Sequence, residues 1–360
     1  MAFSGKVLGR AGLACGWALA AGMSGIGAIR LFRSESQPQL IGLQAVGMWL
    51  LIPAYPLAIA AALARKRTLA AVAIVLALGN VVWVSELYET GQQRAVPVGA
   101  APLRLVTANI LVSNTEVSAL AADLLATGAD VILLQEVTQA HLAELGAAGL
   151  LHAYPFHVFD PHLGSHGSAI LSALPISAGR AIDVAGSPMT RADISTAAGT
   201  VRVINVHTVA PINEPQARRW RAQLDALAAM PAQHAGPLIM AGDFNATADH
   251  EPLDTLLSSG MHDAFSAAGD GIGATWPQWA GPMFPVMRLD HVLVNDSVSV
   301  LSAEVQSNRG SDHRRVAVEL AVPAAVPARG VAAASTRSSL YTCTERLAVT
   351  AAPARRRNDV

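Results

Sequence analysis

The stretch LIMAGDFN (residues 238–245) is an apolar strand that leads directly into Gly-Asp-Phe-Asn. Asp and Asn after an apolar run are also ordinary turn residues, so this string by itself decides little. Two later strings, RLDHVLV (288–294) and SDHRRVAVEL (311–320), add Asp-His pairs next to further strands. Carboxylates, an amide and imidazoles gathered at strand ends are the groups that metal-assisted attack on phosphorus requires. The three strings together predict a site for that chemistry.

Two upstream segments extend this pattern. LRLVTANI (103–110) alternates like a strand and ends near Asn109, and DVILLQEV (130–137) is an apolar run that ends at Gln135 and Glu136. A carboxylate at the end of a buried strand is costly unless it faces water, a cation or a hydrogen-bond donor. We therefore expect Glu136 to face the same site as the later strings.

With these segments the chain resembles the endonuclease/exonuclease/phosphatase superfamily, which has the deoxyribonuclease-I-like fold. The resemblance runs from about residue 102 to 321 and is carried by the strings TAN, LLQEV, HGSAILSALPI, NVHT, GDFNA, LDHVLV and SDHRRV. It implies an α/β fold of two packed mixed β-sheets flanked by helices. It also implies a hydrolase, a phosphodiesterase or phosphatase, in which Mg²⁺, or Mn²⁺, assists water attack on phosphorus.

The metal site is expected at Glu136, because carboxylate and water ligands suit Mg²⁺ and Mn²⁺. Asn109 and Asp312 would complete a ring of oxygen ligands, directly or through water. The alternatives are a helix-cap or turn carboxylate for Glu136 and a turn-forming amide for Asn109.

The resemblance also implies roles for five catalytic residues. Asp243 matches the aspartate that orients or deprotonates the attacking water, and Asn245 matches the asparagine that donates to the phosphate. His313 would donate to a non-bridging oxygen as a cation, and Asp290 matches the carboxylate that pairs with it and raises its pKa. His207 resembles a second catalytic histidine, a candidate general acid for the leaving group. It could instead be a capped surface residue.

Two other polar residues are open to more than one interpretation. Arg191 falls where some branches of the superfamily place an arginine towards the phosphate. It is equally well explained as an ion-pair partner of Asp193 or Asp183. His291 follows Asp290 and so lies on the opposite face of the same strand, which favours a structural role.

Three uncharged apolar runs at the N-terminus make the chain too hydrophobic for an ordinary soluble enzyme, with a mean hydropathy of +0.38. They cover residues 11–29, 40–64 and 68–85, and each is about long enough to cross a ~30 Å hydrocarbon layer. A signal peptide is the alternative for the first run. The expected organisation is a three-span transmembrane anchor (1–85), a linker (86–101), the catalytic domain (102–321) and a disordered tail (322–360).

Basic residues near the three runs favour a membrane orientation. With the N-terminus inside, five Lys or Arg lie on the inner side and three on the outer side. This asymmetry predicts a multi-pass membrane protein with an extracytoplasmic catalytic domain.

Charge also bears on the substrate. Residues 98–320 contain eleven arginines, no lysine and 21 acidic residues, a formal charge of −10. Such a domain is a poor long-range partner for duplex DNA. The apolar loop with Trp276, Trp279 and Phe284 is either core or a lip over the site. These features favour a small or lipid-linked phosphoester, with a nuclease acting on DNA or RNA as the first alternative. A catalytically inactive, membrane-tethered binding module is the second. No protein partner can be deduced.

Overall fold

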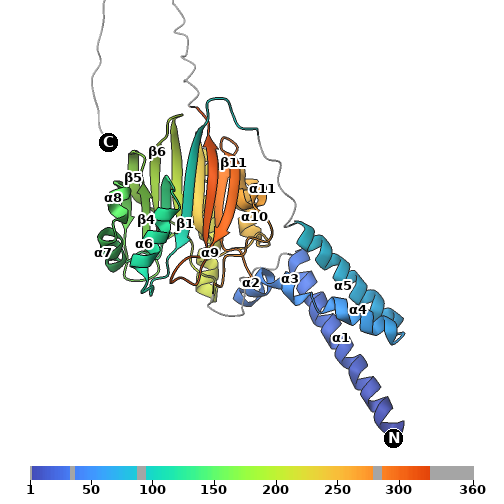
Figure 1. Cartoon of the computed structure of the whole chain (residues 1–360). Coiled ribbons are helices and arrows are strands. Elements are labelled where there is room, and N and C mark those ends of the chain that lie inside the picture. The colour runs from blue at the N-terminus through green and yellow to red at the C-terminus, as the bar shows by residue number, and fades with distance from the viewer. Residues whose placement is uncertain (1, 33–36, 87–94, 279–285, 325–360) are drawn as a thin grey trace, which may run out of the picture. The chain divides into compact units, whose positions relative to one another are not determined.

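The computed structural model describes residues 2–32, 37–86, 95–278 and 286–324. Half of the expected linker, Trp279 and Phe284 of the apolar loop, and nearly all of the C-terminal tail lie outside these residues. The described chain divides into five N-terminal helices and a region of two β-sheets (Figure 1).

The first sheet has six strands in the order β11, β12, β1, β2, β4, β3. Their bounds in that order are Ser299–Gln306, Arg315–Val322, Ala101–Asn109, Val131–Gln135, Ser168–Ser172 and Phe156–Asp160. β1 and β2 run parallel, with Asn109 opposite Gln135, so the ends of both strands meet at one edge of the sheet. The other neighbouring pairs are antiparallel.

The second sheet also has six strands, in the order β5, β6, β7, β8, β10, β9. Their bounds in that order are Ile176–Val184, Ser187–Ser195, Thr200–His207, Leu238–Asp243, Asp290–Asn295 and Met261–Asp263. β7 and β8 are parallel, and His207 lies opposite Asp243. β10 runs antiparallel to β8 and places Asp290 opposite Asp243.

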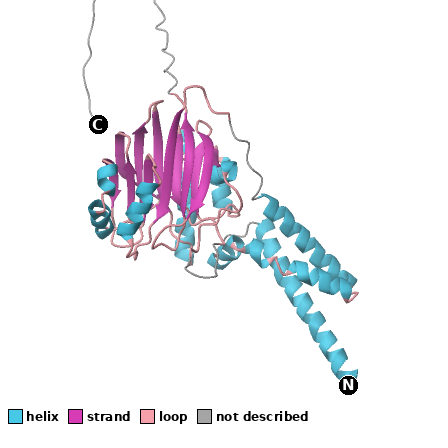
Figure 2. Cartoon of the chain, viewed as in Figure 1, coloured by secondary structure: helices cyan, strands magenta, loops and turns pink. Residues whose placement is uncertain are grey.

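The main core lies between the two sheets, and helices cover their outer faces (Figure 2). In β2 the side chains of Val131 and Leu133 face the inter-sheet core, while Ile132 and Leu134 face the helices. Burial on both faces explains why this strand is an unbroken apolar run. The expected architecture of two packed mixed sheets flanked by helices is therefore confirmed.

The covering helices belong to different sheets. The first sheet packs against α6 (Val117–Ala126), α7 (Gln139–Ala147) and α8 (Leu150–Ala153). The second packs against α9 (Glu214–Ala228) and α10 (Glu251–Ser258), around the fully buried Trp220. A short helix, α11 (Ala264–Ala268), contributes Phe265 to the inter-sheet core.

A buried hydrogen-bond network joins the sheets just beneath their shared edge. Gln135 Nε2 donates to Asn205 Oδ1 at 2.6 Å, and Asn205 Nδ2 donates to Ser168 Oγ at 2.9 Å. Ser168 in turn contacts the Thr190 hydroxyl at 2.7 Å. Buried polar groups of this kind are costly unless paired, so the network fixes how the sheet ends meet.

The N-terminal region folds as α1 (Ala2–Phe32), α2 (Pro38–Ala45), α3 (Gly47–Leu50), α4 (Ala54–Leu63) and α5 (Arg67–Glu86). Two segments within it, Arg10–Phe32 and Arg67–Ser85, are long and apolar enough to cross a membrane. The middle apolar run is not one straight helix, because it bends by 72° between Ala45 and Gly47. This run counts as a third candidate span only if the two helices on either side of the bend are taken together as one span.

Candidate functional site

Two buried carboxylates form the centre of the site. Asp243 ends β8 and Asp290 begins β10, and the antiparallel register sets them opposite each other. They are only 1% and 0% exposed. Burial raises the pKa of Asp243 and the charge of Asp290 raises it further, while the positive charge of neighbouring imidazoles opposes both effects.

His313 is held between these two carboxylates. Its Nδ1 lies 2.8 Å from Asp290 Oδ2, and its Nε2 lies 3.7 Å from Asp243 Oδ2. Burial acts to lower the pKa of His313, but Asp290 and then Asp243 outweigh it and raise this pKa to about 10. The ring is therefore an imidazolium at neutral pH, in contact with the residue that the sequence pairs with it.

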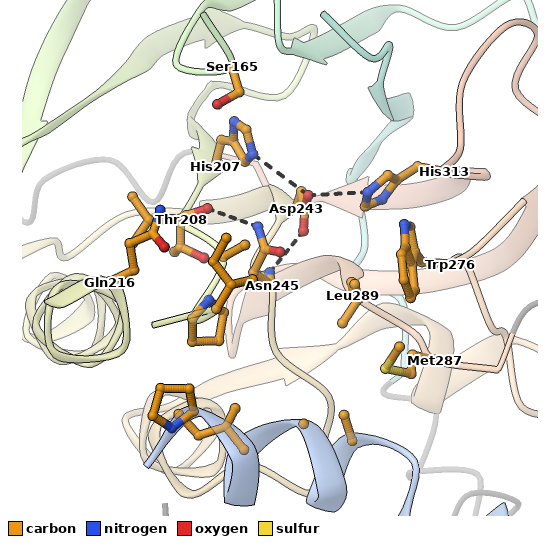
Figure 3. A pocket seen from close by; sticks show the side chains of 18 of the residues that line it. Ser165, His207, Thr208, Gln216, Asp243, Asn245, Trp276, Met287, Leu289 and His313 are labelled. Atoms are coloured by element: carbon orange, nitrogen blue, oxygen red, sulfur yellow. Dashed lines mark hydrogen bonds and ion pairs between the residues drawn. The ribbon is translucent and has the colours of Figure 1, made fainter. Parts of the chain in front are cut away.

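His207 approaches Asp243 from the opposite side (Figure 3). Its Nε2 lies 3.7 Å from Asp243 Oδ2 and 4.0 Å from Glu136 Oε1. Its Nδ1 is buried and has no hydrogen-bond partner among the described residues. The position follows from the parallel register of β7 and β8, and it is not that of a capped surface histidine.

Asn109 connects the two carboxylates that come from different sheets. Its amide Nδ2 donates to Glu136 Oε1 and to Asp243 Oδ2, both at 3.1 Å. Its Oδ1 accepts from the backbone N–H of Leu111 at 3.0 Å. Asn109 thus lies beside the expected metal ligand Glu136, but it acts here as a donor to carboxylates.

Asn245 follows Asp243 in a tight turn, with a φ of 46° that asparagine tolerates better than most residues. Its backbone N–H donates to Asp243 Oδ1 at 2.8 Å, and its Nδ2 donates to the Thr208 carbonyl at 2.9 Å. One hydrogen of that amide remains for a ligand. Asp243 is fixed through both oxygens, so its orientation does not depend on a bound substrate.

Most of these groups open into one cavity of about 720 Å³, but Asn109 and Asp290 are not among its lining residues. Its polar side is lined by Glu136, His207, Asp243, Asn245, Asp312 and His313. Asp312 accepts a hydrogen bond from Trp276 Nε1 at 3.1 Å, which places that tryptophan at the site and not in the core. The apolar side is lined by Val209, Ala210, Pro211, Ile212, Met287 and Leu289, and by residues of α2.

Arg191 is not brought to this cavity. It lies on β6 beside Ala192, which faces the inter-sheet core, so strand alternation turns Arg191 to the outer face. There it lines a different cavity of about 510 Å³ with Arg180 and Arg202. The expected role of Arg191 as a phosphate contact at this site is therefore corrected. Asp193 does form an ion pair, but with Arg202 at 2.7 Å.

His291 has the structural role that strand alternation predicts. It is 2% exposed and lies on the face of β10 away from the cavity. Its Nδ1 is 2.6 Å from Asp263 Oδ2, and its Nε2 is 2.9 Å from the Ala246 carbonyl oxygen.

Sequence reasoning missed several cavity residues. Ser165 and His166 reach it from the loop before β4, and burial, together with the charge of His207, lowers the pKa of His166. The string HGSAIL belongs to the strings that carry the family resemblance, but its sequence predicts no site role for these residues. The α2 residues gave no signal, because their sequence is that of an apolar segment.

A divalent cation fits this set of side chains in one of two places. Asp243, Asp290 and His313 offer ligand atoms within 4.8 Å of one another. However, the raised pKa of His313 keeps its ring protonated at neutral pH, and a protonated nitrogen cannot bind a metal. The oxygens of Glu136 and Asp312 line the same cavity and suit a hard cation better.

Solved structures with the same fold come from distant organisms. An endonuclease/exonuclease/phosphatase family protein from Bacteroides thetaiotaomicron superposes with a TM-score of 0.53 at 18% identity, covering 62% of this chain and 98% of its own. TDP2 from Caenorhabditis elegans gives 0.51 at 19% identity, with coverages of 61% and 98%. The 3′ phosphatase NExo from Neisseria, solved with a product DNA hairpin, gives 0.50 at 21% identity, with coverages of 60% and 98%.

These likenesses show the fold. The search of curated proteins found no match. The model of the Endonuclease/Exonuclease/phosphatase family matches residues 106–313, which is more than half of the chain and includes every catalytic and metal-binding candidate. The chain belongs to the endonuclease/exonuclease/phosphatase family, whose members hydrolyse phosphoesters.

Proposed function

We propose that this chain is a membrane-tethered phosphoester hydrolase that depends on a divalent metal ion, with Mg²⁺ the expected ion. The observation that carries the proposal is the convergence of Asp243, Asn245, His207 and His313 on one cavity that also contains Glu136. All the groups needed to activate water and to bind a phosphoryl oxygen are present. This completeness disfavours a catalytically inactive binding module.

Each residue has a distinct part in the proposed reaction. Asp243, fixed by Asn109 and by the Asn245 backbone, accepts a proton from the attacking water. The imidazolium of His313 and the free amide hydrogen of Asn245 donate to phosphoryl oxygens and stabilise the charge that develops there. His207 is the acid for the leaving oxygen. A cation bound by Glu136 and Asp312, with Asn109 beside it, would polarise the phosphoryl group.

The N-terminal helices support membrane tethering. Two segments are long and apolar enough to span a bilayer, and the distribution of Lys and Arg favours a catalytic domain outside the cytoplasm. A tethered enzyme meets membrane-bound substrates at high effective concentration. We therefore favour a small or lipid-linked phosphoester as the substrate.

Nuclease activity is the second candidate, because a structural neighbour, NExo, was solved with a product DNA hairpin. The charge of −10 on residues 98–320 disfavours it, since polyanionic DNA is usually bound by a basic surface. A tenfold or greater preference for duplex DNA over phospholipid at ~150 mM salt would reverse the order of the two candidates.

The decisive experiment tests purified full-length protein on phosphodiesters and phosphomonoesters with Mg²⁺ or Mn²⁺, and with EDTA. We expect turnover that EDTA abolishes. Asp243→Asn and Glu136→Ala should each lower kcat by roughly 10²–10⁴-fold while the protein stays folded. The matched control is Glu319→Gln, an exposed carboxylate on β12. Full turnover in EDTA would remove the metal from the proposal, and no turnover on any phosphoester would favour a binding module.

A further inference from the structure

One wall of the catalytic cavity is built by the apolar N-terminal region. Helix α2 follows the candidate span that ends at Phe32, and five of its residues line the same cavity as Asp243 and His313 (Figure 3, blue helix). They are Pro38, Gln39, Ile41, Gly42 and Ala45. Four of the five are apolar or lack a side chain, so α2 extends the apolar side of the cavity.

Ile41 shows that α2 is part of the folded domain. It is 3% exposed and packs in the same core cluster as Val209, Phe244 and Ala246. Its carbonyl oxygen accepts a hydrogen bond from Nε2 of the buried His250 at 3.1 Å. The ring is held for this contact because its Nδ1 accepts from the Thr247 N–H at 2.9 Å.

A second group of contacts is centred on Asp249, the residue before His250. Its carboxylate accepts from Arg30 and, at 2.8 Å, from Trp83 Nε1. The Arg30 guanidinium lies 4.2 Å from the Trp83 ring centre. Gln44 of α2 donates to the Asp249 backbone oxygen. One loop of the catalytic domain thus binds the end of α1, helix α2 and helix α5.

The cavity therefore has two chemically different ends. The phosphoester chemistry lies at the carboxylates and histidines. The other end is enclosed by α2 and by the segment of residues 209–212, of which Ile212 is 76% exposed. Exposed apolar surface is stabilised when an apolar ligand covers it. In the chain, α2 lies between the two segments that are long and apolar enough to cross a membrane.

We propose that α2 is a specificity wall of the active site, and that its face with Gly42 and Ala45 receives the apolar chain of a lipid phosphoester drawn from the membrane. The proposal rests on the proposed function and names its substrate class. It predicts that the N-terminal region selects the substrate as well as tethering the enzyme.

Gly42 offers a sharp test, because a Cβ added there meets no atom within 4 Å. Gly42→Phe should fill the apolar end without disturbing the fold. Leu43→Phe, one residue further along and outside the cavity lining, is the matched control. Full-length protein in phosphatidylcholine vesicles is assayed with two p-nitrophenyl phosphodiesters, one with a methyl group and one with a dodecyl chain.

We expect the wild type and Leu43→Phe to prefer the dodecyl substrate by about tenfold or more in kcat/KM, since each buried methylene contributes to binding. Gly42→Phe should abolish the preference, because it should lower kcat/KM for the dodecyl substrate about tenfold or more relative to kcat/KM for the methyl substrate. An equal loss on both substrates, or no chain-length preference in the wild type, would overturn the proposal.

A binding measurement separates this inference from the proposed function. An alkyl phosphonate with a photoreactive diazirine at the chain end needs no turnover. It should label residues 38–45 or 209–212 in the wild type, and labelling should fall about tenfold or more in Gly42→Phe. Labelling without hydrolysis of either ester would refute the catalytic proposal and support the α2 site. Labelling spread over the candidate spans, and unchanged in Gly42→Phe, would refute the α2 site.

Discussion

Single residues in this site owe their chemistry to their burial. His313 and His250 are both buried histidines, yet their pKa values move in opposite directions. Burial disfavours the imidazolium in each. Around His313, Asp290 and Asp243 outweigh that effect, whereas at His250 burial prevails, the charges of Arg221 and His291 add to it, and the pKa falls to about 4. The first histidine acts as a fixed cation and the second as a neutral structural donor.

Asp290→Asn tests the cation at His313. Removing the carboxylate charge should lower the pKa of His313, so that the protonated ring is lost at a lower pH. We expect kcat at neutral pH to fall by roughly 10²–10⁴-fold and the basic limb of the pH–kcat profile to move to lower pH. His313→Ala should show a similar loss of rate. An Asp290→Asn profile that overlays that of the wild type would refute the pairing.

His250 predicts acid sensitivity of the fold. Its pKa in the folded protein is about 4, below the unfolded value of about 6.5, so the unfolded chain binds more protons between these values. The contribution of the neutral His250 side chain to the free energy of unfolding is complete above pH ~6.5. It is lost as the pH falls towards 4. The loss is on the order of 3 kcal/mol. Thermal unfolding of the wild type should therefore shift down between pH 7 and 5 by more than that of His250→Gln.

Helices and strands bring these residues together because of where they end. β7 and β8 run parallel, and β10 runs antiparallel beside β8, so His207, Asp243 and Asp290 meet at one edge. The close approach of β7 and β8 depends on Gly242, which has a φ of 148°. A Cβ at this position would lie 1.9 Å from the Val206 carbonyl oxygen.

Gly242→Ala should therefore destabilise the domain by at least about 2 kcal/mol, because neither backbone can move without breaking the β7–β8 pairing. Differential scanning calorimetry of the full chain measures the effect. Gly164→Ala is the control, since a Cβ there meets nothing within 4 Å and its unfolding temperature should hardly change. Equal midpoints for the two variants would show that β8 tolerates a side chain at this turn.

On the scale of the whole molecule, the N-terminal region and the sheets share one set of contacts at Asp249 and His250. The candidate spans and the catalytic cavity are thereby linked through α2. If the helices cross a membrane, the cavity is held close to its surface. The side of the membrane then decides which substrates the enzyme meets.

The distribution of Lys and Arg predicts that side. Alkaline phosphatase fused after residue 324 should be active in a bacterial host, and a fluorescent protein that matures only in the cytoplasm should be dark at the same position. The opposite result with both reporters would place the catalytic domain in the cytoplasm and leave its chemistry unchanged.

Sequence alone determined the family, the two-sheet fold and the catalytic candidates that line the cavity. These features could be predicted because short strings such as GDFN and SDH combine an apolar strand with the polar residues at its end. The local sequence pattern thus predicts both the strand and the polar side chains that the strand places at its end. Strands β5 and β11 and the placement of Asn109 as a donor between carboxylates were not predicted, because they depend on neighbours in other segments.

Only the tertiary structure decided the position of Arg191 and the role of α2. Arg191 has the residue type of a phosphate ligand, but the inter-sheet core binds Ala192 and so turns Arg191 to the outer face. Helix α2 has the composition of a membrane segment, and nothing local separates it from one. Its place in the cavity follows from contacts such as His250 with Ile41, which are 209 residues apart in the chain. A contact between residues so far apart in the sequence depends on how the whole core packs, and no local sequence pattern encodes it.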